Sequence, residues 1–135
     1  MTAEVIYQGN LRTEATHIRS GNTCLTDAPV DNRGKGETFS PTDMVAVAHA
    51  SCILTIMGIK AADHEIDITG TSAKTTKTMA SDPRRIIRLE VIIDMPDKSY
   101  SDKQKKILEK AAYYCPVKNS LHPDLEEIIH INWKH

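Results

Sequence analysis

The chain has 135 residues, of which 17 are basic and 18 acidic, and its formal net charge is −1. This length predicts one domain over residues 1–135 with a single hydrophobic core. The balanced charge argues against a nucleic-acid-binding protein, and one Phe, one Trp and four Tyr are too few to form base-stacking surfaces.

The termini and the cysteine count indicate a cellular compartment. Residues 1–7 show no basic segment followed by an apolar one, so we expect no signal peptide. We also expect no apolar run of transmembrane length, and therefore a soluble cytoplasmic protein without a membrane partner. The three cysteines are unevenly spaced and do not form a disulfide scaffold. In the cytoplasm thiols stay reduced, so a pair of them is more often catalytic or redox-sensing than structural.

The N-terminal part of the chain is typical of a strand meander. Three short strands are predicted, at residues 4–7, 14–19 and 23–26. Gly9-Asn10 between the first two is a turn signal, because these residue types accept positive φ at low cost. Residues 27–38 are polar and contain two glycines, which predicts a loop long enough to contribute to a functional site.

A long helix is predicted to follow. Ser40 is a capping residue, Pro41 suits the first helical position, and Asp43 stands three residues after the cap. Nearly every position from 44 to 62 is apolar or small, which indicates a buried helix. A small sheet cannot cover such a helix alone, so we expect a homodimer that shares its core.

The C-terminal half alternates between strands and helices. Strands are predicted at residues 66–69, extending over 71–79, at 84–95 and at 127–133. A capping box at Ser101 begins an amphipathic helix to Ala112, and Pro116 begins a short helix that ends near Leu121. The order of elements predicts an α+β fold with mainly antiparallel sheets around a long buried central helix.

Cys52 lies three turns inside the long predicted helix, too far from its N-terminus for the helix dipole to activate a thiol. A reactive thiolate there needs a nearby cation, and the candidates are Arg12, Arg19, Arg33 and His49. From composition alone, a packed core cysteine is the more frequent interpretation. His49, at i−3 on the same helix face, is likewise more simply interpreted as a residue packed at an interface.

Cys115 stands directly before Pro116 at a helix start, where unpaired N–H groups favour a negative sulfur. The alternative is a thiol that only caps the helix, and the sequence favours neither of these two interpretations. Cys24, in a predicted strand, is expected to pack. No His or Cys has ligand spacing such as H-x-x-x-H or C-x-x-C, so we expect no metal and no bound cofactor.

Residues 36–52, from Gly36 through Cys52, resemble the first cysteine helix of the OsmC/Ohr superfamily. Residues 113–117 resemble its second cysteine motif, and residues 7–12 and the closing strand fit the same pattern. The resemblance implies an OsmC-like fold, and an intertwined homodimer with two active sites built from both subunits. It also implies thiol-dependent reduction of hydroperoxides, preferably organic ones, in the defence against oxidative stress.

The resemblance further implies a role for each cysteine. Cys52 attacks the peroxide and becomes a sulfenic acid, and Cys115 condenses with it to a disulfide before overoxidation. An external dithiol of the lipoyl type then restores both thiols. Arg12 best matches the arginine that holds the Cys52 thiolate and polarises the peroxide, with Arg19 as the reserve.

The chain departs from the family pattern at Thr42. In the peroxidase subfamilies a glutamate follows the helix-start proline and positions the arginine. Asp43 is one residue away, which turns its side chain by about 100° around the helix. Either Asp43 or Glu37 substitutes, or the arginine is less ordered.

Two other functions remain open at this point. One is a non-enzymatic protein of the same fold that binds a small hydrophobic molecule in the dimer cleft, which the missing glutamate favours. The other is a redox sensor in which the Cys52–Cys115 disulfide switches a partner interaction.

Overall fold

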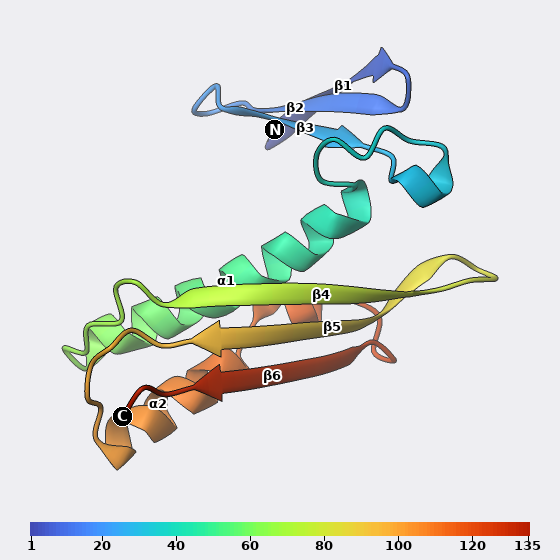
Figure 1. Ribbon diagram of the computed structural model, residues 1–135. Coiled ribbons are helices and arrows are strands. Elements are labelled where there is room, and N and C mark those ends of the chain that lie inside the picture. The colour runs from blue at the N-terminus through green and yellow to red at the C-terminus, as the bar shows by residue number, and fades with distance from the viewer. The chain divides into compact units, whose positions relative to one another are not determined.

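The computed structural model describes all 135 residues as two compact units, Met1–Val45 and Ala46–His135. Figure 1 shows the elements of both units in chain order. The boundary between the units falls within the second turn of the long helix α1 (Pro41–Asp63).

The first unit contains the predicted meander as a three-stranded antiparallel sheet in the order β1-β2-β3. Its strands are β1 (Ala3–Gly9), β2 (Arg12–His17) and β3 (Thr23–Asp27). Gly9, Asn10 and Leu11 all have positive φ, which confirms the predicted turn and lets β2 begin at Arg12. The predicted loop at residues 27–38 contains a single 3-10 turn, η1 (Val30–Asn32).

Helix α1 begins as the sequence predicts. The Ser40 N–H donates to Asp43 Oδ2 and the Asp43 N–H donates to Ser40 Oγ, both at 3.0 Å, so the two residues cap the helix reciprocally. The buried residues of α1 follow one helical stripe: Ala46, His49, Ala50, Ile53, Met57 and Ala61.

The expectation that no apolar run reaches transmembrane length is wrong. By length and composition α1 could cross a membrane, and 33% of its most apolar 18-residue window is buried. The core helix of a soluble protein meets the same criteria.

The second unit is built on the sheet β4-β5-β6, formed by β4 (Ser72–Ala80), β5 (Arg85–Asp94) and β6 (Glu126–Asn132). β4 and β5 are antiparallel, whereas β6 runs parallel to β5. Alternate residues of β5, namely Leu89, Val91 and Ile93, are fully buried. Because alternate side chains of a strand share one face, these residues define the face of the sheet that packs into the core.

Two helices complete this unit: α2 (Asp102–Ala112) and the short α3 (Pro116–Asn119). α2 lies with α1 on one side of the sheet (Figure 1). The capping box at Ser101 is present, since its hydroxyl accepts from the Gln104 N–H and its N–H donates to Gln104 Oε1. Leu108, Ala111 and Ala112 are buried, as their spacing predicts.

The predicted strand at residues 66–69 is wrong. The Asp67 carboxylate accepts from the Thr69 N–H at 2.9 Å, and the Thr71 N–H donates to the Ile68 carbonyl at 3.0 Å. These local bonds satisfy the backbone as turns, so no ladder forms before β4. Ile66 and Ile68 alternate because both pack against the core, without belonging to a strand.

The main core lies between α1, β5 and α2. Ile53 and Met57 of α1 contact Val91 and Ile93 of β5 and Leu108 of α2 in one buried cluster. The α+β fold, with mainly antiparallel sheets and a long central helix, is therefore confirmed. Only the β5–β6 pairing is parallel.

We expect Leu108→Ala to lower the free energy of unfolding by about 2–5 kcal/mol, because it leaves a cavity in this core. Chemical denaturation measures the loss. Lys106→Ala, at an exposed position of the same helix, serves as the control and changes stability by less than about 0.5 kcal/mol. Equal losses in the two variants would show that α2 does not pack by its Leu108 face.

Candidate active site

Two cysteines that lie far apart in the sequence come together in the second unit. Cys52, in the middle of α1, is half-buried and packs against the core cluster. Cys115, between α2 and α3, is 1% exposed. Both lie in one packed region, with Cys52 close enough to raise the pKa of Cys115, and both thiols are free rather than joined in a disulfide.

Two main-chain contacts fix the Cys115 sulfur. Its S–H donates to the His49 carbonyl of α1 at 3.9 Å, and its sulfur accepts from the Lys118 N–H at 3.5 Å. Cys115 is thus the N-cap of α3. Pro116 at the first helical position suits this geometry, since a proline has no N–H that would need a partner there.

The helix start does not produce a negative sulfur at Cys115, contrary to one of the two expectations from the sequence. Burial raises the pKa of the Cys115 thiol, and the opposing Lys118 N–H does not offset it. The neighbouring Cys52 thiol raises the pKa further. Cys115 is therefore a protonated thiol at neutral pH.

This arrangement suits a two-step thiol reaction. Cys52 is the more accessible of the two sulfurs, so it meets an incoming reagent first. Cys115 keeps its proton and lies beside Cys52, where it can trap an oxidised sulfur. The product of such trapping is a disulfide between α1 and the segment that joins α2 to α3.

His49 is fully buried, one helical turn before Cys52. Its Nε2 lies 2.5 Å from Glu127 Oε2 on β6, and the Glu127 side chain is only 12% exposed. Its Nδ1 is buried without a hydrogen-bond partner. The sequence suggests an interface residue at position 49, and the structure places it in an ion-pair geometry within the core.

Arg12 is held at the start of β2 by two carboxylates of the first unit. Its Nε and Nη2 donate to the two oxygens of Asp27 at 2.7 and 2.8 Å, and Nη2 also donates to Glu37 at 3.2 Å. The Arg12 guanidinium holds the pKa of the buried Asp27 carboxyl well below its usual range. The Asp27 carboxylate in turn raises the pKa of Arg12.

Of the other residues that the sequence suggests for this arginine site, one contacts Arg12 and the rest have other contacts or lie exposed. Glu37 does contact Arg12, as one of the predicted substitutes for the family glutamate. Asp43 caps α1 through Ser40, and Thr42 Oγ1 lies 3.2 Å from Ser40 Oγ. Arg19 lies exposed in the turn after β2, and Arg33 follows η1 with a φ of 68°.

Sequence reasoning missed two acidic residues, Asp27 and Glu127. Asp27 was placed in a loop, but it ends β3 and is the direct cross-strand partner of Arg12. An arginine and an aspartate at the two matched ends of a predicted hairpin could have indicated this pair. Glu127 had no such signal, because it meets His49 only through the parallel pairing of β6.

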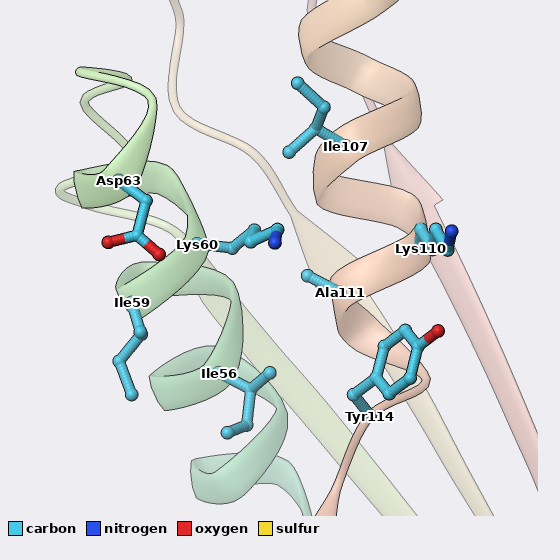
Figure 2. A pocket seen from close by; sticks show the side chains of 8 residues that line it. All are labelled: Ile56, Ile59, Lys60, Asp63, Ile107, Lys110, Ala111 and Tyr114. Carbon is cyan, nitrogen blue, oxygen red and sulfur yellow. The ribbon is translucent and has the colours of Figure 1, made fainter.

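A groove lies between α1 and α2 (Figure 2). Its volume is about 540 Å³. The lining residues are Ile56, Ile59, Lys60, Asp63, Ile107, Lys110, Ala111 and Tyr114. Ile56 follows Cys52 by one helical turn and Tyr114 directly precedes Cys115, so two lining residues stand close in sequence to the two cysteines. No cluster of three or more metal-ligating side chains is present.

We expect Cys115 to be the last of the three thiols to react with iodoacetamide at neutral pH. Cys24 is exposed and Cys52 half-buried, whereas Cys115 is buried with a raised pKa, so its alkylation follows that of the other two. Mass spectrometry of quenched samples follows each site. Alkylation of Cys115 as fast as Cys24 would contradict the burial, and urea-unfolded protein provides the control in which all three react.

We expect Asp27→Asn to remove part of the acid sensitivity of folding. The pKa of Asp27 is lower in the folded chain than in the unfolded one, so its stabilisation is present above about pH 4 and is lost as the pH falls further. The variant is less stable than wild type at pH 7, and its stability changes less on acidification. Urea unfolding from neutral pH to about pH 2 measures both.

Asp63→Asn, at an exposed position of α1, is the matched control for this titration. It should keep the wild-type dependence on pH. Superimposable acid profiles for wild type and Asp27→Asn would contradict the Arg12–Asp27 pairing.

Comparison with known proteins places these features in a family. Residues 34–127 match the family model of OsmC-like protein. A crystal structure from Psychrobacter arcticus 273-4, of a "putative osmotic stress induced and detoxification response protein", is 52% identical. That alignment covers 98% of this chain and 96% of the other, with a TM-score of 0.93. No curated protein matches the chain.

More distant structures share the fold. An organic hydroperoxide resistance protein OsmC from Legionella pneumophila is 13% identical, with a TM-score of 0.76 over 97% of this chain and 95% of the other. The organic hydroperoxide resistance protein OhrB of Bacillus subtilis is 15% identical, with a TM-score of 0.68 over 98% of both chains. From the match to the family model and the 52% identical structure, this chain belongs to the OsmC-like protein family.

Proposed function

We propose that this protein is a thiol-dependent hydroperoxide reductase that acts on organic hydroperoxides. The observation that carries the proposal is the reduced pair of Cys52 and Cys115, which pack in the same region of the second unit. Family membership and the names of the distant relatives, which include organic hydroperoxide resistance proteins, support the substrate class.

The proposed cycle has three balanced steps. The Cys52 thiolate attacks one oxygen of ROOH, the O–O bond breaks, and ROH leaves after taking up a proton. Cys52 is then a sulfenic acid. The Cys115 sulfur attacks it, a disulfide forms, and the thiol proton and the hydroxyl leave as water. An external dithiol of the lipoyl type reduces the disulfide and is itself oxidised to a disulfide.

The Cys52 thiolate requires a cation, and we assign Arg12 to this role on the chemistry of its side chain. Its guanidinium is oriented by two hydrogen bonds to the Asp27 carboxylate and one to Glu37. Such a preorganised cation also stabilises the charge that develops on the departing oxygen. The Asp27 carboxylate provides the orientation for which the family pattern has a glutamate at position 42.

The groove between α1 and α2 favours a hydrophobic substituent on the peroxide. Its walls carry three isoleucines (Figure 2), and two lining residues, Ile56 and Tyr114, stand close in sequence to Cys52 and Cys115. The same groove is the observation that supports a second candidate function, a non-enzymatic protein that binds a small hydrophobic molecule. The neighbouring pair of reduced thiols favours the peroxidase.

We further propose a homodimer in the cytoplasm. β1 is the edge strand of its sheet, and its Val5, Ile6 and Tyr7 are 61%, 53% and 63% exposed. Ile59 of α1 is 57% exposed. Such apolar surface is typical of a protein interface. Sedimentation velocity at several concentrations tests this, and a monomer of 15.0 kDa at all of them would contradict it.

To test the reaction, reduced protein is mixed with excess cumene hydroperoxide and its cysteines are followed by mass spectrometry. We expect rapid formation of a Cys52–Cys115 disulfide in wild type and none in Cys52→Ser. Cys115→Ser should accumulate sulfinic and sulfonic acid at Cys52, since no thiol traps the sulfenic acid. Two free thiols after prolonged exposure would exclude the peroxidase and leave the ligand-binding function.

The role of Arg12 is tested in the same assay. We expect Arg12→Gln to slow Cys52 oxidation by about 100-fold, the usual loss when a preorganised charge is removed from a reaction site. Arg19→Gln, which changes the reserve arginine at an exposed turn, should keep the wild-type rate and is the matched control. The opposite ranking of the two variants would transfer the role to Arg19.

A further inference from the structure

The side chains of His49 and Glu127 form a buried polar contact one helical turn from Cys52. His49 belongs to the buried stripe of α1, where its neighbours Ala46, Ala50 and Ile53 are apolar. Its imidazole is 0% exposed and meets the Glu127 carboxylate at 2.5 Å. The proposed cycle gives neither side chain a chemical step, yet burying an imidazole and a carboxylate is costly unless they are paired.

The same helical turn positions both sulfurs. The His49 main-chain carbonyl accepts the Cys115 S–H. Cys52 follows His49 by three residues and therefore lies on the same side of α1. Cys52 also packs against the cluster that contains Cys115. Whatever holds this turn in place thus sets the approach of Cys52 to Cys115.

Apolar packing alone does not determine the rotation of α1. The helix is apolar or small around most of its circumference, so several rotations would bury similar apolar area. A shift of one residue turns each side chain by about 100°. Such a shift would separate His49 from Glu127 and leave both buried without a partner, which is strongly unfavourable.

We propose that His49 and Glu127 are positioning residues for the thiol pair. Their bond ties α1 to β6 in one rotation and thereby holds Cys52 beside Cys115. The proposal rests on the proposed function only for the identity of the reacting thiols. It assigns neither side chain a proton transfer, and both act through the geometry of α1.

The test is the redox equilibrium of the two thiols in mixtures of reduced and oxidised dithiothreitol, in a Cys24→Ser background. The two thiols and oxidised dithiothreitol give the protein disulfide and reduced dithiothreitol, so the equilibrium constant reports how well the sulfurs are held together. We expect Glu127→Met to lower this constant by about tenfold or more, a shift of about 30 mV. Glu127→Gln, which keeps a hydrogen-bond acceptor for His49, stays within about threefold of wild type.

Ile131→Ala is the matched control. Ile131 lies four residues beyond Glu127 on the same face of β6 and packs against the core cluster that contains Cys115. This variant loses stability through a cavity but should leave the thiol equilibrium unchanged. Equal shifts in Ile131→Ala and Glu127→Met would show that the pair contributes only to general stability, and would overturn the proposal.

The double variant His49→Leu/Glu127→Met separates stability from positioning. It removes both buried polar side chains of the pair, so neither is left unpaired, and we expect it to fold and to recover stability where a single variant fails. Its thiol equilibrium should remain lowered, because nothing then fixes the rotation of α1. Recovery of both stability and the wild-type equilibrium would overturn the proposal.

Peroxide is absent from this experiment, so its outcome is distinct from that of the peroxidase assay. A protein that reduces no peroxide but shows the expected order of variants would exclude the proposed function and support the positioning role. Wild-type thiols that form no disulfide at any dithiothreitol ratio would overturn both.

Discussion

Burial of one stripe of α1 against β5 and α2 holds the second unit together, and the thiol pair depends on this packing. Ile53 and Met57 anchor the helix on Val91 and Ile93, and Cys52 lies beside Ile53 on the edge of the same contact. Cys115 enters from the end of α2, whose Ala111 and Ala112 allow a close approach to α1. Two residues that are distant in sequence thus meet because three elements share one core.

Burial is accompanied by a charged side chain in the first unit and by a neutral one in the second. In the first, Arg12 is surrounded by carboxylates and Asp27 keeps its charge in a buried position. In the second, burial keeps Cys115 neutral although a helix begins there. The backbone N–H groups of Val117 and Lys118 at the start of this short helix supply less stabilisation to a thiolate than the lost hydration removes. A protonated, buried thiol beside an accessible one favours an ordered sequence of reactions at the two sulfurs.

Much of this organisation was predictable from the sequence. The caps at Ser40 and Ser101 are local signals, and both helices begin there. The alternation of Ile66 and Ile68 resembles a strand, so the sequence predicts one at residues 66–69. In the structure the Thr69 N–H donates to the Asp67 carboxylate, and the chain turns. Periodicity detects which side chains are buried, but it does not reveal where the backbone finds its partners.

The two cysteines of the candidate site were identifiable from the sequence, whereas the role of Arg12, which the family resemblance implies, stays a prediction. The contact of Glu37 with Arg12 is one of the three alternatives that the sequence leaves open at this position. Asp27 was hidden by its assignment to a loop, although strand register decides its partner. Glu127 could not be found, because the contact with His49 depends on the parallel addition of β6, which leaves no local pattern in the sequence.

The capping role of Cys115 has a consequence for the oxidised protein. In the reduced chain its sulfur donates to the His49 carbonyl and accepts from the Lys118 N–H. A disulfide sulfur has no proton to donate, so oxidation removes the first bond, and any movement of the sulfur toward Cys52 weakens the second. The oxidation state of the pair therefore affects the backbone of α3. The hydrogen-exchange rate of the Lys118 amide should differ between the reduced and the oxidised protein.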